Sequence, residues 1–75
     1  MIVTFIAGDK QADFKVEKHD LIKDVLEVLN ESTELKVNQD LQYVISERRK
    51  QKINVLYTFA QAKIYNGDVL KTGEL

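Results

Sequence analysis

The sequence contains no cysteine, no proline and no tryptophan, and it has only three glycines and one histidine. Without cysteine the chain forms no disulfide and performs no thiolate chemistry, which fits a reducing compartment. Without proline, and with so little glycine, it shows no linker and no low-complexity segment. We therefore expect a single domain that spans residues 1–75.

Long hydrophobic runs are also missing. No apolar run approaches the roughly 18 residues that a membrane-spanning helix needs. Residues 1–8 are apolar, but they lack a basic segment and are too few for a secretory signal peptide. We expect a cytoplasmic protein that does not insert into a membrane.

The net charge of −1 indicates neither a polyanion nor a membrane as a partner, but the charges are unevenly distributed. Residues 1–46 carry nine acidic and five basic side chains, whereas residues 47–75 carry three acidic and six basic ones. Four of the cations fall close together in a predicted turn, here called the basic turn: Arg48, Arg49, Lys50 and Lys52. This turn suits an acidic protein partner or a phosphate; alternatively, it is an ordinary solvated turn that blunts a strand edge.

Nucleic acid is not expected as a partner. Binding to it would require exposed aromatic side chains interleaved with the cations. The nearest aromatic residues, Tyr43 and Tyr57, are expected to be half-buried in predicted strands.

One stretch, residues 20–34, has a clear helical period. Its apolar side chains recur at positions i, i+3, i+4 and i+7: Ile22, Val25, Leu26 and Leu29. Asp20 precedes the first turn and is the predicted N-cap. A helix over residues 21–32 would be marginal alone in water, so we expect its apolar stripe to lie on a sheet.

β-Branched and aromatic residues predict that sheet. We expect an antiparallel hairpin of residues 1–7 and 12–18, then strands at 41–46, 53–58 and 69–72. Side chains predicted to face inward from these strands are Phe14, Val16, Leu41, Tyr43 and Ile45. Residues 59–64 are predicted to form a helical turn with Phe59 and Ile64 on the core; alternatively, residues 62–65 and 69–72 form a plain hairpin.

The order β–β–α–β–β–β, with one substantial helix, predicts an α+β fold of the β-grasp type. In this fold a mixed sheet of four to five strands packs on the helix. A ferredoxin-like split fold would need a second helix of comparable length.

Side chains that carry chemistry are few, and we expect no catalytic, cofactor-binding or metal site. His19 is the single histidine and is expected to be solvated in a loop. Three carboxylates alternate along an exposed strand face instead of converging as metal ligands would: Asp9, Asp13 and Glu17. Neither Ser32 nor Ser46 has an identifiable base partner.

The sheet face turned away from the helix is a second candidate for protein binding. Val44, with Ile2 or Ile6, is expected to leave apolar atoms exposed there. A contiguous patch would be a docking site, whereas scattered aliphatic side chains would need no explanation. The candidate protein-binding residues are thus Val44, Arg48, Arg49, Lys50 and Lys52.

The order of the first strand, the turn at Gly8, the second strand and a helix entered through Asp20 resembles ubiquitin. Residues 58–64, Thr-Phe-Ala-Gln-Ala-Lys-Ile, resemble the Thr-Leu-Ser-Asp-Tyr-Asn-Ile segment of ubiquitin. The pattern Ile64-x-Asn66-Gly67-Asp68-x-Leu70 is similar to the close of the YukD/EsaB-like family. These small bacterial ubiquitin-like proteins accompany type VII (ESX-like) secretion systems.

This resemblance implies a non-enzymatic accessory or regulatory protein without a cofactor, whose partner is a protein component of a secretion machine. The alternative is a ubiquitin-like modifier or sulfur carrier that acts through its C-terminus. Those proteins end in Gly-Gly, because an activating enzyme must thread the tail and adenylate its carboxylate. This chain ends Lys71-Thr72-Gly73-Glu74-Leu75, without Gly-Gly, and YukD-like proteins also lack that tail. The alternative is therefore disfavoured. A third interpretation is a ubiquitin-like domain of a larger protein.

Overall fold

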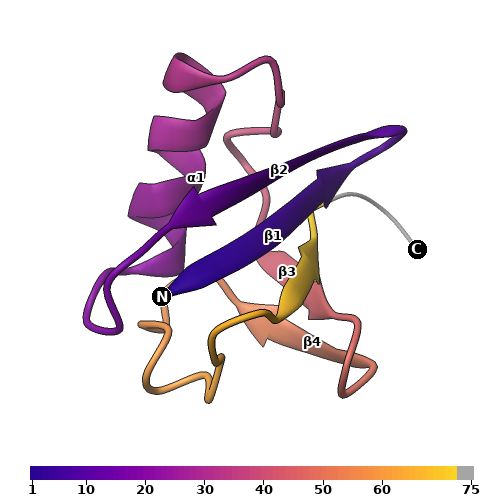
Figure 1. The fold of residues 1–75 in the computed structure, drawn as a ribbon. Coiled ribbons are helices and arrows are strands. Elements are labelled where there is room, and N and C mark those ends of the chain that lie inside the picture. Colours follow the sequence, from indigo (N-terminus) through magenta and orange to yellow (C-terminus); the bar gives the residue numbers. More distant parts are fainter. Residues whose placement is uncertain (73–75) are drawn as a thin grey trace.

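The computed structural model describes residues 1–72, which contain one helix and five strands (Figure 1). The elements are β1 (Ile2–Ala7), β2 (Lys10–Lys15), α1 (Ile22–Ser32), β3 (Tyr43–Ser46), β4 (Gln51–Asn54) and β5 (Val69–Lys71). Their order along the chain is the predicted β–β–α–β–β–β.

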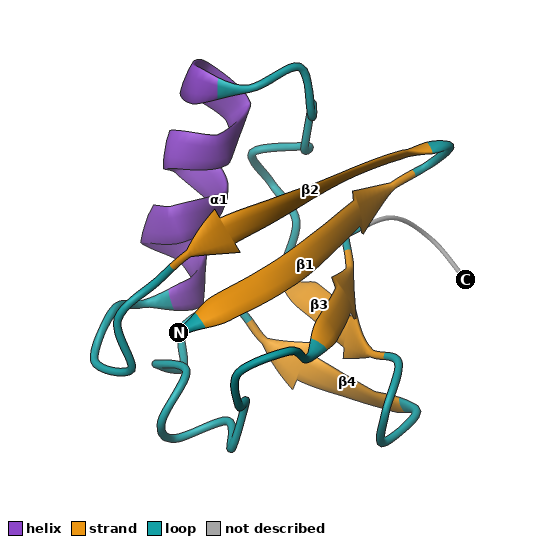
Figure 2. Ribbon diagram, in the orientation of Figure 1, coloured by secondary structure: helices purple, strands orange, loops and turns teal. Residues whose placement is uncertain are grey.

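The five strands form one mixed sheet in the order β2-β1-β5-β3-β4. β1 pairs antiparallel with β2 and parallel with β5, and β3 pairs antiparallel with both β5 and β4. α1 lies against one side of this sheet (Figure 2). The predicted β-grasp is confirmed, and the alternative hairpin of residues 62–65 with 69–72 is wrong, because β5 pairs with β1 and β3 instead.

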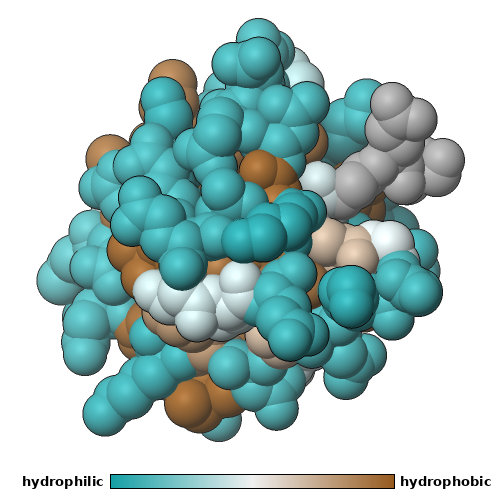
Figure 3. Space-filling view, turned by 90° about the horizontal axis from the view of Figure 1, so that it is seen from above, coloured by the Kyte–Doolittle hydropathy of each residue, from teal (hydrophilic) through white to brown (hydrophobic). Residues whose placement is uncertain are grey.

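The core lies between α1 and the sheet. All four residues of the predicted helical stripe are buried, and they form one cluster with Val3 and Phe5 of β1 and with Leu70 of β5. Each fully buried aliphatic side chain of this kind contributes about 1.5–3 kcal/mol relative to an exposed one. On the face seen in Figure 3 the surface is mostly hydrophilic, and hydrophobic side chains show only as separate patches.

The N-terminus of α1 differs from the prediction. Leu21, not Asp20, occupies the N-cap position, and it makes no side-chain capping bond. The Asp20 carboxylate instead accepts a hydrogen bond from the backbone N–H of Glu17 at 3.0 Å. Asp20 therefore closes the loop that precedes the helix.

Backbone carbonyls from the segment after β4 take the place of a side-chain cap. The N–H of Ile22 donates to the carbonyl of Tyr57 at 3.0 Å, and the N–H of Lys23 donates to that of Val55 at 2.9 Å. Helix starts leave four N–H groups without an intrahelical partner, and tertiary contacts satisfy two of them here. β4 also differs from the predicted strand of residues 53–58: it begins earlier, at Gln51, and it ends at Asn54 because the chain then leaves the sheet to meet α1.

β3 presents the opposite face from the one predicted. Val44 is fully buried and pairs with Ile53 of β4, which is also buried. Tyr43 is 46% exposed and Ile45 is half-buried, although both were expected to face inward. Of the three residues predicted to face inward from residues 41–46, Leu41 alone packs against the core. A shift of one residue moves every side chain of a strand to the other face. The expected exposure of Val44 is therefore wrong.

Residues 58–63 form a hydrogen-bonded turn that buries Phe59 and Ile64, as predicted. Thr58 and Gln61 start it with a capping box. The N–H of Thr58 donates to Gln61 Oε1 at 3.0 Å, and the N–H of Gln61 donates to Thr58 Oγ1 at 3.1 Å. Lys63 ends the turn in the left-handed region, with φ of 57°.

Candidate protein-binding surfaces

Three residues of the basic turn, Arg48, Arg49 and Lys50, join β3 to β4, whereas Lys52 lies in β4 and not in the turn as predicted. Arg48 is turned back onto the protein. Its Nε donates to Asp68 Oδ1 at 2.8 Å and its Nη2 donates to Asp68 Oδ2 at 3.0 Å. The guanidinium also lies 5.4 Å from the centre of the Tyr65 ring. The Arg48 guanidinium holds the pKa of Asp68 below its usual value, and Asp68 in turn raises the pKa of Arg48. Arg48 therefore has a structural role.

Arg49 also contacts the protein itself. Its Nη2 donates to the carbonyl of Ala62, and Arg48 Nη2 donates to the carbonyl of Lys63 at 3.3 Å. Both carbonyls belong to the end of the 58–63 turn, where helix-like segments leave acceptors unsatisfied. The two arginines, from the loop between β3 and β4, thus cap the end of this turn.

The lysines of the basic turn are more open to solvent. Lys50 Nζ lies 2.9 Å from Glu47 Oε2, and Lys71 Nζ of β5 lies 3.2 Å from Glu47 Oε1. The hydrogen bonds from Lys50 and then Lys71 lower the pKa of Glu47. Lys52 Nζ lies 5.6 Å from the ring of Tyr43. The predicted cations are therefore not one open cluster, and protein binding by Arg48, Arg49, Lys50 and Lys52 stays a prediction.

The side of the sheet turned away from α1 is here called the outer sheet face. It includes Ile6, Tyr43, Ile45, Lys52, Val69 and Lys71. Ile45 lies directly across from Lys52 on β4 and from Lys71 on β5, and Lys71 lies across from Ile6 on β1. Residues directly opposite each other share a face. Aliphatic and lysine side chains therefore alternate in one row across four strands: Ile6, Lys71, Ile45 and Lys52. Val69 of β5 lies diagonally next to Ile6 and Ile45 on the same face.

The aliphatic residues of the outer sheet face are partly accessible to solvent. Ile6, Ile45 and Val69 are half-buried, and no helix or strand of residues 1–72 is packed over them. Tyr43 adds an exposed aromatic ring on β3. Lys52 and Lys71 are exposed on either side of Ile45. The outer sheet face thus mixes aliphatic side chains with two cations, and these cations favour an acidic partner surface.

Ile45, and not Val44, is therefore the central aliphatic residue of the solvent-facing sheet. Sequence reasoning missed it because Tyr43, Val44 and Ile45 are all apolar, so alternation alone does not choose between the two faces. A usable signal was in β4, Gln-Lys-Ile-Asn, where Ile53 is the single apolar residue and must face the core. Its position across the hairpin from Val44 fixes the orientation of β3.

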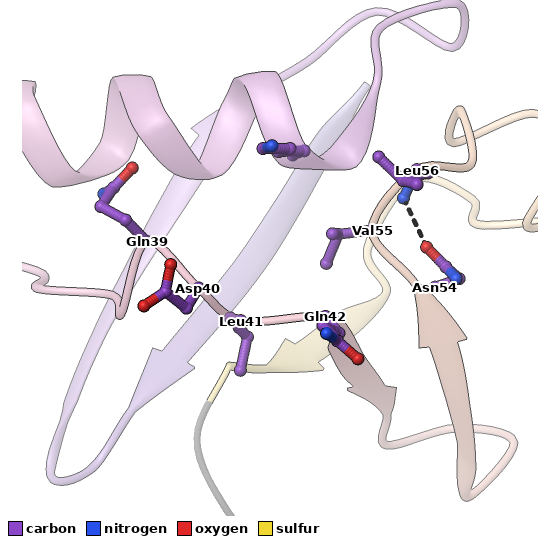
Figure 4. Close-up of a pocket in the computed structure, with 8 residues that line it drawn as sticks. Gln39, Asp40, Leu41, Gln42, Asn54, Val55 and Leu56 are labelled. Carbon is purple, nitrogen blue, oxygen red and sulfur yellow. Dashed lines mark hydrogen bonds between the residues drawn. The ribbon is translucent and has the colours of Figure 1, made fainter.

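A groove of about 480 Å³ lies between the loop that precedes β3 and the turn that follows β4 (Figure 4). Two of its backbone N–H groups are bonded within the protein: the N–H of Val55 donates to the carbonyl of Gln42 at 3.0 Å, and the N–H of Leu56 to Asn54 Oδ1 at 2.9 Å. Lys23 and Asp40 are the charged residues among those that line it. The described lining holds no pair of a nucleophile and a base.

Residues named as possible carriers of chemistry do not converge. His19 is exposed in the loop before α1, and Ser46 is buried, where its Oγ accepts a hydrogen bond from the N–H of Arg49. Across residues 1–72, no three histidine or carboxylate side chains gather as metal ligands would. Among the described residues 1–72, no helix has the length and the apolar character that crossing a membrane requires. The expected lack of catalytic, cofactor and metal sites stays a prediction.

Known proteins share the fold of this chain. No protein-family model matches the sequence, and no curated protein matches it. Among solved structures, the chain is similar to the N-terminal ubiquitin-like domain of the 4931431F19Rik protein, with a TM-score of 0.73 and 12% sequence identity. The match covers 100% of this chain and 76% of that one. The fold is therefore ubiquitin-like, and identity this low carries no function with it.

Proposed function

We propose that this protein is a non-enzymatic ubiquitin-like accessory or regulatory protein of a bacterial type VII (ESX-like) secretion system, acting in the cytoplasm by protein–protein contact. The observation that carries the proposal is the outer sheet face. Its aliphatic residues Ile6, Ile45 and Val69 are half-buried, and the exposed cations Lys52 and Lys71 flank Ile45 on the neighbouring strands. Such a surface can dock on a partner without changing it chemically.

The secretion context rests on the resemblance of residues 64–70 to the YukD/EsaB-like family. This segment is hydrogen-bonded to the start of β1. The N–H of Ile2 donates to Asn66 Oδ1 at 2.7 Å, and Gly67, with φ of +90°, donates its N–H to the carbonyl of Ile2 at 2.8 Å. Asp68 then binds Arg48 of the basic turn. The pattern therefore sets how β1, β5 and the basic turn meet.

A complementation experiment tests the role. The gene is deleted in its own host, and export of the small helical-hairpin substrates of the secretion system is measured with wild-type, Ile45→Glu and Leu56→Glu proteins. Leu56→Glu is the matched control, because Leu56 is an aliphatic side chain 62% exposed at the groove, away from the outer sheet face. We expect deletion and Ile45→Glu to reduce export, and Leu56→Glu to restore it.

Two outcomes would contradict the proposal. Unchanged export after deletion would remove the secretion role. Full export with a folded Ile45→Glu protein would remove the outer sheet face as the contact. The alternative, transfer of an activated C-terminal carboxylate, concerns residues 73–75, which lie outside the described part of the chain. An ATP-dependent adenylate or thioester at Leu75, detected by intact mass in cell extract, would favour that alternative.

A further inference from the structure

β2 is an edge strand, and β1 is its one partner within residues 1–72 (Figure 1). The N–H of Val16 donates to the carbonyl of Met1 at 2.8 Å, which makes this a hydrogen-bonded pair. Because such pairs alternate in antiparallel ladders, the main-chain groups of Phe14 and Ala12 also point toward β1. The N–H and C=O groups of Gln11, Asp13 and Lys15 therefore point to the free edge, where they can template another strand.

β2 contains no proline, and its charged side chains are of both signs, so a suitable register can pair them instead of keeping a second strand away. Asp13 and Lys15 lie on the side of the outer sheet face, across from Thr4 and Ile2. Phe14 lies on the opposite side and packs on the core, but at the edge of the sheet it stays half-buried. The edge strand thus carries one negative charge at Asp13, two positive charges at Lys10 and Lys15, and a half-buried aromatic ring.

These features select one antiparallel register between two copies of β2. Placing Asp13 across from Asp13, or Lys15 across from Lys15, sets like charges opposite each other, which is destabilising. Placing Gln11 across from Asp13 sets Phe14 across from Lys10. Placing Asp13 across from Lys15 creates two opposite-charge pairs by symmetry. It also sets Phe14 across from the second Phe14 at a non-hydrogen-bonded position, where side chains approach most closely.

We propose that the protein forms a symmetric homodimer through β2 in this register, with Asp13 of each copy opposite Lys15 of the other. The new ladder is short, because the N–H and C=O of Glu17 already bind Asp20 Oδ2 and the N–H of Asp20, each at 3.0 Å. Association is therefore weak, depends on concentration, and falls as salt screens the exposed pairs. The dimer presents two outer sheet faces on one continuous sheet, and it does not depend on the proposed role in secretion.

Charge exchange between the two positions provides the test, by sedimentation equilibrium from micromolar to millimolar concentration. We expect wild-type protein to dimerise as concentration rises. Asp13→Lys alone and Lys15→Asp alone stay monomeric, because each sets like charges across the ladder. An equimolar mixture of the two variants dimerises again, since every pair then has opposite charges. The double variant Asp13→Lys/Lys15→Asp also dimerises.

The controls separate this register from other effects. Lys23→Asp and Glu31→Lys change the net charge by the same amounts at exposed positions on α1, and both should dimerise as wild type does. Thermal unfolding checks that each variant folds, because Asp13 also accepts a hydrogen bond from Thr4 Oγ1 at 2.6 Å. A monomeric wild-type protein at millimolar concentration overturns the proposal. Dimers of both single variants, or a mixture that stays monomeric, overturn it equally.

Discussion

Arg48 and Asp68 form a bidentate ion pair that ties the turn between β3 and β4 to the start of β5. The Asp68 side chain is only 8% exposed. Its carboxylate accepts a third hydrogen bond, at Oδ2, from the N–H of Tyr65 at 2.9 Å. Charge-assisted bonds of this fork geometry are among the stronger polar contacts in proteins. A carboxylate this enclosed is costly to leave without its partner.

Removing the carboxylate should therefore destabilise the fold. We expect Asp68→Ala to lower the free energy of unfolding by about 1–3 kcal/mol, since it leaves the N–H of Tyr65 and the guanidinium of Arg48 without their acceptor. Lys50→Ala is the control: the Lys50 side chain is 76% exposed, and loss of its pair with Glu47 should cost less than about 0.5 kcal/mol. Urea unfolding measures both, and equal losses would contradict this role of Asp68.

The same pair predicts a pH dependence. Arg48 lowers the pKa of Asp68 in the folded protein, so the ionised carboxylate favours folding above its unfolded pKa of about 4. That contribution is lost as the pH falls through the lower, folded pKa. We expect wild type to exceed Asp68→Asn in unfolding free energy by a constant amount near neutral pH, and the difference to shrink below about pH 4. Urea unfolding of both proteins across this range tests it; a difference that does not change with pH would argue against the ion pair.

Local patterns predicted most of the fold. The apolar stripe of α1 has a helical period, and residues 1–18 pair as neighbours in sequence, so both could be read from short stretches. The start of α1 could not, because the acceptors for Ile22 and Lys23 come from a segment that is distant in sequence. β3 failed for a related reason: its face is set by partners on β4 and β5.

The candidate surfaces show the same division. The density of cations in the basic turn was visible in the sequence, but the partners of Arg48 and Arg49 lie in the 58–68 segment and depend on the fold. Asp68 stood out only as part of the Asn-Gly-Asp pattern, with no indication that it would bind Arg48. Long-range polar contacts of this kind follow from topology, which alternation and propensity do not specify.

Val44 and Ile45 are neighbours on opposite faces, and substitutions should separate stability from binding. Val44→Ala removes fully buried atoms and should lower the unfolding free energy by about 1–3 kcal/mol. Ile45→Ala removes half-buried atoms and should cost less than about 1 kcal/mol. In the export assay the order reverses: Ile45→Ala impairs function, whereas Val44→Ala functions below its melting temperature. A larger loss of stability from Ile45→Ala would mean that β3 is oriented as the alternation of Tyr43 and Ile45 first predicts.

The capping box of Thr58 and Gln61 supports more than its own turn. It starts the segment whose Ala62 and Lys63 carbonyls receive the two arginines, so weakening it should loosen the basic turn as well. We expect Thr58→Ala to lower the unfolding free energy by about 1 kcal/mol and to speed hydrogen exchange of the Gln61 amide, whose acceptor is lost.

Thr58→Ser is the matched variant, because serine keeps the hydroxyl acceptor and should leave both quantities near wild type. If the alanine and serine variants behave alike, the methyl group rather than the hydroxyl stabilises this turn. If Thr58→Ala speeds hydrogen exchange of the Gln61 amide and leaves every other amide unchanged, the effect is local. Faster exchange at Arg49, whose N–H donates to Ser46 Oγ at 3.2 Å, would show that the turn and the arginines are held as one unit.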